Sequence, residues 1–314
     1  MPVTVRSFAK INLGLRIGAR RADGFHELLT VYQTIGLHDL IRVSLGRGSG
    51  IEIRCEDQRV PRDESNTCHR IVDKAMSALG VKGRIAIEIE KRLPVQGGMG
   101  GASSNAVAAL FGLERVLKKH LTGEERLRIA SEVGSDVPLF LIGGTILGRG
   151  RGEQVYPLED LPSMPCVLVT PDVGVSTPEA FAKWDCKLTA PQASDRMNEL
   201  GLGLSAWLSE SYSGAPRMRG RRGNPLLELV RAGIKNDFEE VVFPEYPELS
   251  EVKQALERVG AKYASLSGSG SALYGLFVSN AAARAAAKKL RDQGWAAQAT
   301  ATVTRRRYWR GIWA

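Results

Sequence analysis

Residues 91–106, KRLPVQGGMGGASSNA, place four glycines and two serines in one short turn of this 314-residue chain. Glycine has no Cβ, so such a turn takes positive φ values and brings several backbone N–H groups close to one anion. Apolar residues recur at helical spacing behind the turn: Val107, Leu110, Phe111 and Leu117. A helix therefore begins at the turn, and its N-terminal dipole adds to the attraction for an anion. The segment predicts a phosphate-binding loop, and a plain glycine-rich surface turn is the alternative.

Residues 84–90, RIAIEIE, alternate polar and apolar side chains, which predicts a strand just before the loop. Strand, glycine-rich loop and helix together are the context in which phosphate loops occur. A Walker loop needs a lysine after its last glycine, and no lysine lies in or just after this turn. A dinucleotide-binding fingerprint needs a third glycine where this chain has Ser103. The sequence therefore excludes both of these common phosphate motifs.

The composition is that of an ordinary soluble globular protein, with 43% hydrophobic and 25% charged residues. No apolar run approaches the length of a membrane span, and polar residues alternate with apolar ones from Thr4 onward. We therefore expect no signal peptide, no membrane partner and a cytoplasmic location. The four cysteines show no CxxC spacing and the four histidines form no ligand pair, so we expect free thiols and no protein-held metal.

The net charge of +9 suits a nucleic-acid-binding protein, and it equally suits an enzyme whose substrates are polyphosphates. The excess positive charge is concentrated in residues 217–222 and in the tail at residues 305–310. A solvated loop and a solvated tail are the alternative interpretation of these two basic runs. Charge alone therefore leaves the class of ligand open.

The length of 314 residues allows two domains or one large one. Prolines and acidic residues at 157–165 mark a domain edge, which predicts domains at residues 1–156 and 165–314. Residues 194–223 are expected to be irregular. Residues 148–152, GRGRG, are a second segment able to approach a phosphate or another strand closely. Strands are predicted at 3–17, 41–53 and 166–170, and helices at 124–132, 249–259 and 281–293, so the fold class is α+β.

Several segments in order along the chain resemble the GHMP kinase superfamily. They include FAKINLG at residues 8–14, the glycine-rich loop, GSDVP at 134–138 and SLSGSG at 265–270. Further segments are similar to the branch of that superfamily whose alcohol substrate carries cytidine diphosphate: RADGFHEL at 21–28, Asn66, GRGRGE at 148–153, STPEAF at 176–181 and NDFE at 236–239. The resemblance covers nearly the whole chain. It implies an N-terminal ATP-binding α/β domain like a ribosomal protein, a C-terminal α/β sandwich, and an active site in the cleft between them.

The resemblance implies an ATP-dependent kinase that phosphorylates the 2-hydroxyl of cytidine-diphosphate-linked methylerythritol, in the non-mevalonate route to isoprenoid precursors. Mg²⁺ is expected to accompany ATP, although the sequence offers no dedicated carboxylate pair for it. We expect a small-molecule substrate, no nucleic acid partner, and a monomer or weak homodimer. The alternatives are another GHMP kinase, acting on homoserine, a mevalonate derivative or a sugar, and a basic nucleic-acid-binding protein.

The resemblance assigns the catalytic pair to Lys10 and Asp136. An ammonium group at the first position is able to hold a transferring phosphoryl group. A carboxylate at the second position is able to accept the proton of the substrate hydroxyl. Taken without the resemblance, the two residues are a surface strand lysine and a helix cap.

The remaining site residues are also implied by the resemblance. Asn12 is assigned to the methylerythritol hydroxyls, Phe25 and Phe181 to the two faces of the cytosine, and His26 to its hydrogen-bonding edge. The chain departs from the family pattern at Phe25, where tyrosine is usual, and at Gln96, Met99 and Ala102 within the loop. The residues assigned to ATP are Asn66, Pro94, Val95, Gln96, Gly97, Gly98, Met99, Gly100, Gly101, Ala102, Ser103 and Ser104.

Overall fold

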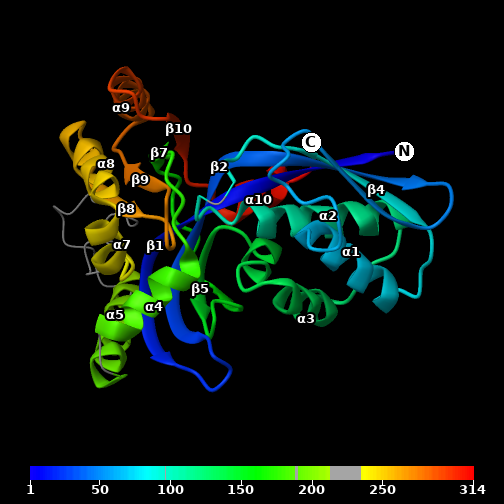
Figure 1. Cartoon of the computed structure of the whole chain (residues 1–314), viewed down its shortest axis with the longest axis horizontal. Helices are drawn as coiled ribbons and strands as arrows, with labels where there is room; N and C mark the ends of the chain where they lie inside the picture. Colours follow the sequence, from blue (N-terminus) through cyan, green and yellow to red (C-terminus); the bar gives the residue numbers. More distant parts are fainter. Residues whose placement is uncertain (96, 188–189, 213–234) are drawn as a thin grey trace.

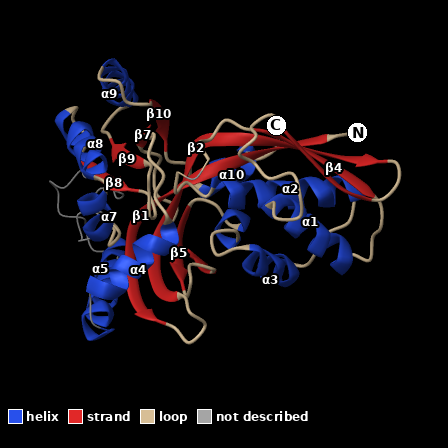
Figure 2. Ribbon diagram, viewed as in Figure 1, coloured by secondary structure: helices blue, strands red, loops and turns tan. Residues whose placement is uncertain are grey.

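A long antiparallel hairpin of β1 (Val3–Arg20) and β2 (His26–Gly46) runs through the molecule in the computed structural model (Figures 1 and 2). The structure describes residues 1–95, 97–187, 190–212 and 235–314. Because β2 is long, its C-terminal half pairs with β4 (Arg84–Glu90) and its N-terminal half with β5 (Thr145–Arg149). Two further strands complete this six-stranded sheet: β3 (Gly50–Cys55), parallel to β4, and β6 (Gln154–Pro157), antiparallel to β5.

Helices α1 (Thr67–Ala78), α2 (Gly101–Leu117) and α3 (Gly123–Val133) form a layer beside the hairpin (Figure 1). The alternation in β4 turns Ile85, Ile87 and Ile89 inward, as the sequence predicts, and they share a core cluster with α1 and α2. Helix α2 crosses β2 closely at Gly112, where a Cβ atom would lie 2.5 Å from Val43 Cγ2. The contact between α2 and β2 is therefore packed so tightly that a side chain at position 112 would have to displace Val43.

A second, four-stranded sheet has the order β10-β7-β9-β8 and is antiparallel throughout. Ile11 and Leu13 of β1 share a core cluster with Leu168 and Leu276 of this sheet. The hairpin therefore takes part in the cores of both sheets. The strands are β7 (Pro165–Val169), β8 (Tyr263–Leu266), β9 (Leu273–Leu276) and β10 (Ala297–Ala301). The helices of this half are α4 (Thr177–Lys187), α5 (Ala190–Tyr212), α7 (Glu239–Glu245), α8 (Pro247–Arg258) and α9 (Asn280–Asp292).

Helix α5 corrects the prediction that residues 194–223 are irregular, because residues 194–212 are helical. Ala193, Leu200 and Leu204 are buried, and this spacing of seven and four residues puts them on one helix face. The face packs against β1. The segment is polar on average, so its composition does not reveal this narrow apolar stripe. Residues 213–223 lie outside the described part of the chain.

The two ends of the chain lie together. Helix α10 (Arg305–Gly311) packs beside the six-stranded sheet. Tyr308 and Ile312 belong to the core cluster that this sheet shares with α1 and α2. Arg6 N of β1 donates to Ile312 O at 2.7 Å. Helix α10 falls within residues 165–314 but packs against the core of residues 1–156. The division into domains at 1–156 and 165–314 therefore stays a proposal. None of the described helices is both long and apolar enough to cross a lipid bilayer.

Substitution of Gly112 tests the close approach of α2 to β2. Gly112→Ala should lower the free energy of unfolding by about 1–3 kcal/mol, because the added methyl group overpacks the contact with Val43. Gly123→Ala is the matched control, since this helical glycine has no atom within 4 Å of a built Cβ. Urea unfolding monitored by circular dichroism measures both variants. Equal stability of the two variants would contradict the packing argument.

Candidate active site

Lys10 lies on β1 between two irregularities in the β1–β2 register, one between Phe8 and Lys10 and one between Asn12 and Gly14. Such bulges bend a strand and redirect the side chains beside them. Lys10 is only 3% exposed, and its Nζ donates to Asn12 Oδ1 at 2.7 Å and to Gly98 O at 2.8 Å. The buried ammonium therefore joins the strand to the glycine-rich loop.

Asp136 lies in the turn between α3 and the 3₁₀ helix η1 (Pro138–Leu141). Its Oδ2 is 3.3 Å from Lys10 Nζ, and its Oδ1 accepts a hydrogen bond of 3.0 Å from Tyr32 Oη. The carboxylate is 31% exposed, whereas the lysine side chain beside it is almost fully buried. The structure therefore brings together the two residues assigned as catalytic, and the carboxylate remains accessible to a ligand.

Residues 97–101 form the first glycine loop. Gly98 and Gly100 have φ values of 69° and 66°, which are costly for other residues. A Cβ on Gly98 would lie 2.2 Å from Ser267 O, so the loop is closely packed. Gly100 caps α2 without a side-chain hydrogen bond, and the first turn of α2 carries no acidic residue. This helix N-terminus is therefore suited to an anion.

Residues 267–271 form the second glycine loop, and it lies against the first. Ser267 Oγ donates to Gly98 O at 3.0 Å, and Ala272 N donates to Gly97 O at 3.3 Å. A Cβ on Gly268 would lie 3.5 Å from both Lys10 Nζ and Asn12 Oδ1. The two loops therefore meet at the ammonium group of Lys10.

The NDFE segment at residues 236–239 holds the second glycine loop in place. Asn236 Nδ2 donates to Leu266 O at 2.9 Å and to Gly268 O at 2.8 Å. The carboxylate of Glu239 accepts from Leu266 N at 2.9 Å. Asp237 pairs with Arg16 of β1 at 2.6 Å. The segment thus has a structural part, since it ties the second loop to the strand that carries Lys10.

Asn12 is 1% exposed, and its amide lies within a hydrogen-bonded chain. The Oδ1 atom accepts from Lys10, while Nδ2 donates to Thr30 Oγ1 at 2.8 Å, and that hydroxyl donates to Gly14 O at 2.8 Å. The side chain therefore orients the ammonium group in this structure. Its assignment to the methylerythritol hydroxyls stays a proposal.

The residues assigned to cytosine gather at the start of β2. His26 is 6% exposed, its Nε2 is 2.6 Å from Asp185 Oδ1, and its ring is stacked on Phe181 at 4.7 Å. Phe25 is 50% exposed, and the Arg151 guanidinium lies over its ring at 4.8 Å. The structure thus brings His26 and Phe181 into ring contact. Arg151, which the sequence analysis did not single out, lies over the ring of Phe25, and half of Phe25 stays exposed.

Asn66 uses its side chain to cap α1. Its Oδ1 accepts from Cys68 N at 2.8 Å and its Nδ2 donates to Pro61 O at 2.6 Å. Within the loop assigned to ATP, Met99 and Ser104 are buried, Val95 and Ser103 are partly buried, and Pro94 and Ala102 are exposed. Gln96 lies outside the described residues. The structure therefore gives Asn66 a structural part and leaves its contact with adenine as a proposal.

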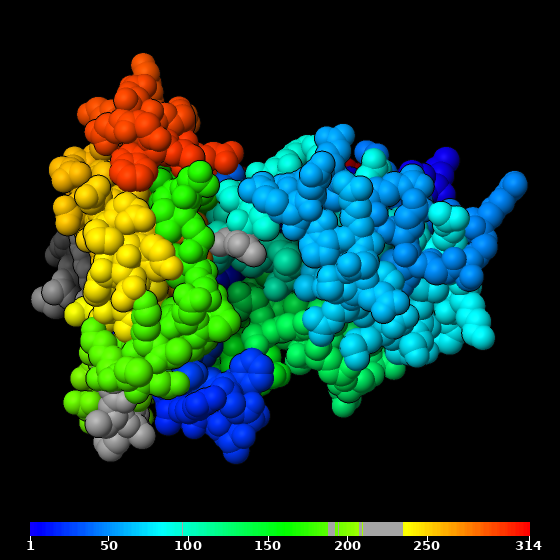
Figure 3. All heavy atoms as spheres, viewed as in Figure 1, coloured from blue at the N-terminus to red at the C-terminus, as the bar shows by residue number. Residues whose placement is uncertain are grey.

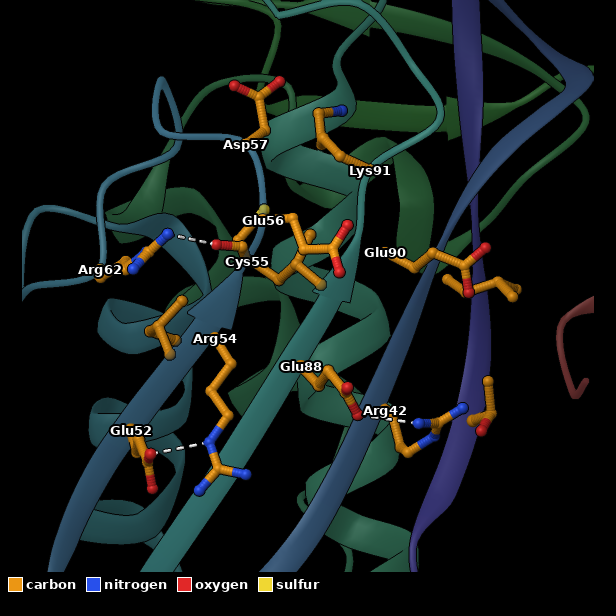
Figure 4. A pocket seen from close by; sticks show the side chains of 14 residues that line it. Arg42, Glu52, Arg54, Cys55, Glu56, Asp57, Arg62, Glu88, Glu90 and Lys91 are labelled. Atoms are coloured by element: carbon orange, nitrogen blue, oxygen red, sulfur yellow. Dashed lines mark hydrogen bonds and ion pairs between the residues drawn. The ribbon is translucent and has the colours of Figure 1, made fainter.

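A groove of about 970 Å³ extends over β3, the C-terminal end of β4 and the neighbouring parts of β1 and β2 (Figure 4). Cys55, Asp57 and Lys91 line one end of it, and Arg62 donates to Cys55 O there. Lys91 pairs with buried Asp39 at 2.6 Å, and its Nζ would lie 3.7 Å from a Cβ on Gly101. This end of the groove therefore reaches the N-terminus of α2. The sequence analysis gave Lys91 no role, because this lysine precedes the loop instead of following it.

The space-filling view is hollowed between the cyan segments of the first half and the green and yellow segments of the second (Figure 3). Contacts between the two glycine loops, at Gly97 and Gly98, join these halves. The hydrogen bond from Lys10 to Gly98 O and the ion pair between Lys10 and Asp136 lie at the same junction. The candidate catalytic groups and the N-terminus of α2 therefore converge where the two sheets meet.

Residues 66–144 match the family of the GHMP kinases N terminal domain, and residues 220–294 match that of the GHMP kinases C terminal domain. The 4-diphosphocytidyl-2-C-methyl-D-erythritol kinase of Solibacter usitatus is 37% identical over 274 residues, covering 87% of this chain and 80% of the relative. The protein of the same name from Desulfitobacterium hafniense is 36% identical over 304 residues, with coverage of 96% and 97%.

Among solved structures, a crystal structure of 4-(cytidine 5'-diphospho)-2C-methyl-D-erythritol kinase has a TM-score of 0.73 and 30% identity, covering 95% of this chain and 98% of that one. Homoserine kinase from Cytophaga hutchinsonii has a TM-score of 0.72 at 21% identity, with coverage of 96% and 95%, and shares the fold. These matches confirm the two-domain GHMP kinase fold that the sequence motifs predict. The chain therefore belongs to the GHMP kinase family, in the branch of the 4-diphosphocytidyl-2-C-methyl-D-erythritol kinases.

Proposed function

We propose that this chain transfers the γ-phosphoryl group of ATP to the 2-hydroxyl of 4-diphosphocytidyl-2-C-methyl-D-erythritol, in the non-mevalonate route to isoprenoid precursors. The observation that carries this proposal is the Lys10–Asp136 pair beside the N-terminus of α2, which has no side-chain cap. The shared name of the relatives supports the choice of alcohol. Activity as a monomer or weak homodimer, without a nucleic acid partner, belongs to the same proposal.

In the proposed reaction, the 2-hydroxyl oxygen forms a bond to the γ-phosphorus while the bond from that phosphorus to the β–γ bridging oxygen breaks. The electron pair of the broken bond leaves with ADP, and the hydroxyl proton passes to the carboxylate of Asp136. The ammonium group of Lys10 is held by Asn12 and Gly98, so it is already oriented toward the charge that develops on the transferred group.

ATP is proposed to place its phosphates at the N-terminus of α2, where Gly98 and Gly100 allow the backbone to approach an anion. The groove end at Cys55, Asp57 and Lys91 lies beside this helix terminus and is proposed to receive the adenosine. Asn66 is proposed to contribute to this arrangement through structure, because its side chain caps α1 and fixes the turn that precedes this helix.

Mg²⁺ is proposed to accompany ATP. Among residues 1–95, 97–187, 190–212 and 235–314, no group of three or more His, Cys, Asp or Glu side chains is arranged to hold a metal. The hydroxyl oxygen of Ser103 is of the type that Mg²⁺ prefers, so it fits a metal whose other ligands are phosphate oxygens and water. When bound, Mg²⁺ would neutralise charge on the phosphates.

The cytidine end of the substrate is proposed to lie at the start of β2. Phe25 exposes half of its surface and Phe181 is partly exposed, so both rings have area available for stacking on a base. His26 is oriented by Asp185 and is suited to hydrogen bonding with a pyrimidine edge. Phe25, His26 and Phe181 together support an alcohol substrate that carries a nucleotide over a small alcohol such as homoserine.

A coupled ADP-release assay tests the proposed substrate. The chain should release ADP faster with the cytidyl alcohol than with homoserine, mevalonate or galactose, because only the cytidyl alcohol uses the ring cluster at His26. The assay compares kcat/KM for the four alcohols at one ATP concentration. A higher kcat/KM for one of the other three would contradict the proposed substrate.

The Asp136→Asn variant tests the base. It should lower kcat by roughly 10²–10⁴ while ATP affinity is unchanged, because the amide cannot accept the hydroxyl proton. Asp292→Asn, at the exposed end of α9, is the matched control and should keep full activity. Steady-state kinetics and titration with ATP measure both. Near-normal turnover of a folded Asp136→Asn protein would exclude this residue as the base.

Removal of the aromatic rings tests the cytosine subsite. Phe25→Ala and Phe181→Ala should each weaken binding of the cytidyl substrate by about 1–3 kcal/mol, as loss of base stacking does elsewhere. ATP affinity should stay constant. Trp313→Ala is the control, because Trp313 is also exposed and carries an arginine, Arg115, over its ring at 4.3 Å. Isothermal titration reads out all three, and wild-type affinity in both phenylalanine variants would contradict the stacking model of recognition.

A further inference from the structure

Tyr32 of β2 places its hydroxyl group against the carboxylate of Asp136. The Tyr32 side chain is 2% exposed, and its Oη donates to Asp136 Oδ1 at 3.0 Å. The other carboxylate oxygen, Oδ2, is 3.3 Å from Lys10 Nζ. Lys10 Nζ also lies 5.7 Å from the centroid of the Tyr32 ring. The two oxygens of Asp136 are therefore held by different donors.

The backbone of the GRGRG segment leaves space for the Tyr32 ring. A Cβ on Gly148 would lie 2.5 Å from Tyr32 Cε2, and a Cβ on Gly152 would lie 2.4 Å from Tyr32 Oη. Gly152 also takes a φ of 99°, which favours glycine. The close approach that the sequence predicts for these glycines is therefore an approach to a tyrosine, at the point where that tyrosine meets Asp136.

The Tyr32 hydroxyl is suited to be a permanent donor. Burial raises the pKa of Tyr32 well above 10, and the negative charge of Asp136 raises it further. The hydroxyl therefore keeps its proton throughout the range in which a kinase works, and it does not itself take the substrate proton. Its contribution to the reaction has to come through the carboxylate that it contacts.

We propose that Tyr32 is a positioning residue for phosphoryl transfer, whose hydroxyl fixes Asp136 Oδ1 so that Oδ2 is directed to the reacting hydroxyl. The inference rests on the proposed function, since it takes Asp136 as the base. A carboxylate held at one oxygen cannot rotate freely about its Cβ–Cγ bond. Small displacements of a catalytic group cost large factors in rate, so the restraint favours turnover more than substrate binding.

Tyr32→Phe removes the hydroxyl and keeps the ring that fills the space beside Gly148. The variant should lower kcat by about 10-fold and leave KM for ATP and for the alcohol within about 2-fold of wild type. In an Asp136→Asn background the same substitution should change the residual rate by less than about 2-fold, because the group that Tyr32 positions is no longer a base. A structural role alone would lower the rate equally in both backgrounds.

Tyr308→Phe is the matched control. Tyr308 is also 2% exposed, and its Oη donates to Phe140 O at 2.6 Å, so the variant likewise loses one buried hydroxyl and its hydrogen bond. It should lower the Tm by an amount similar to that of Tyr32→Phe, while its kcat stays at the wild-type value. A loss of kcat equal to that of Tyr32→Phe would assign the effect to lost stability and overturn the proposal.

The assay uses whichever of the four alcohols the wild-type chain phosphorylates fastest. If that alcohol is not the cytidyl substrate, the proposed function is wrong while the comparison of Tyr32→Phe with Tyr308→Phe still decides the positioning role. An unchanged kcat in Tyr32→Phe overturns the positioning role and leaves the proposed function standing. A wild-type chain that releases ADP with none of the alcohols overturns both.

Discussion

Burial of the Lys10 ammonium group is the constraint on which the rest of the site depends. A buried charge is tolerated only when it is paired and hydrogen-bonded, and Lys10 obtains its partners from three separate segments of the chain. They are Asn12 on the same strand, the carbonyl of Gly98 and the carboxylate of Asp136. The strand, the first glycine loop and the turn before η1 therefore have to converge, and this convergence places the N-terminus of α2 beside the carboxylate of Asp136.

The close approach of the two glycine loops extends this convergence to the second half of the chain. A side chain at Gly98 would collide with the backbone of Ser267, so the contact is made between two backbones. The NDFE segment holds the second loop through Asn236, while its neighbour Asp237 accepts from Arg16 at 2.6 Å and from Ile17 N at 3.0 Å on β1. Strand β1 therefore carries the ammonium group of Lys10 and also anchors the second glycine loop beside it. Loss of the contacts between β1 and Asp237 would therefore also disturb the surroundings of Lys10.

Sequence patterns located those elements whose periodicity is local. The alternation at residues 84–90 is strand β4, and the predicted helix at 249–259 matches α8 (Pro247–Arg258) within two residues. The glycine-rich turn does lead into a helix, α2. Helix α5 was not predicted, because its buried residues Ala193, Leu200 and Leu204 are widely spaced in a polar segment. These side chains are buried by packing against β1, which is distant in the sequence, so no local pattern predicts their burial.

The sequence by itself determined the glycine-rich turn that leads into α2 and, through its motifs, the resemblance that names Lys10 and Asp136 together. Both depend on short stretches in which residue type dictates backbone freedom or charge. Tertiary structure alone decided that Tyr32 binds Asp136, 104 residues away, that Arg151 covers Phe25, and that His26 stacks on Phe181. These contacts join side chains from distant segments, and their geometry follows from the register of the strands and the packing of the layers, which no local pattern records.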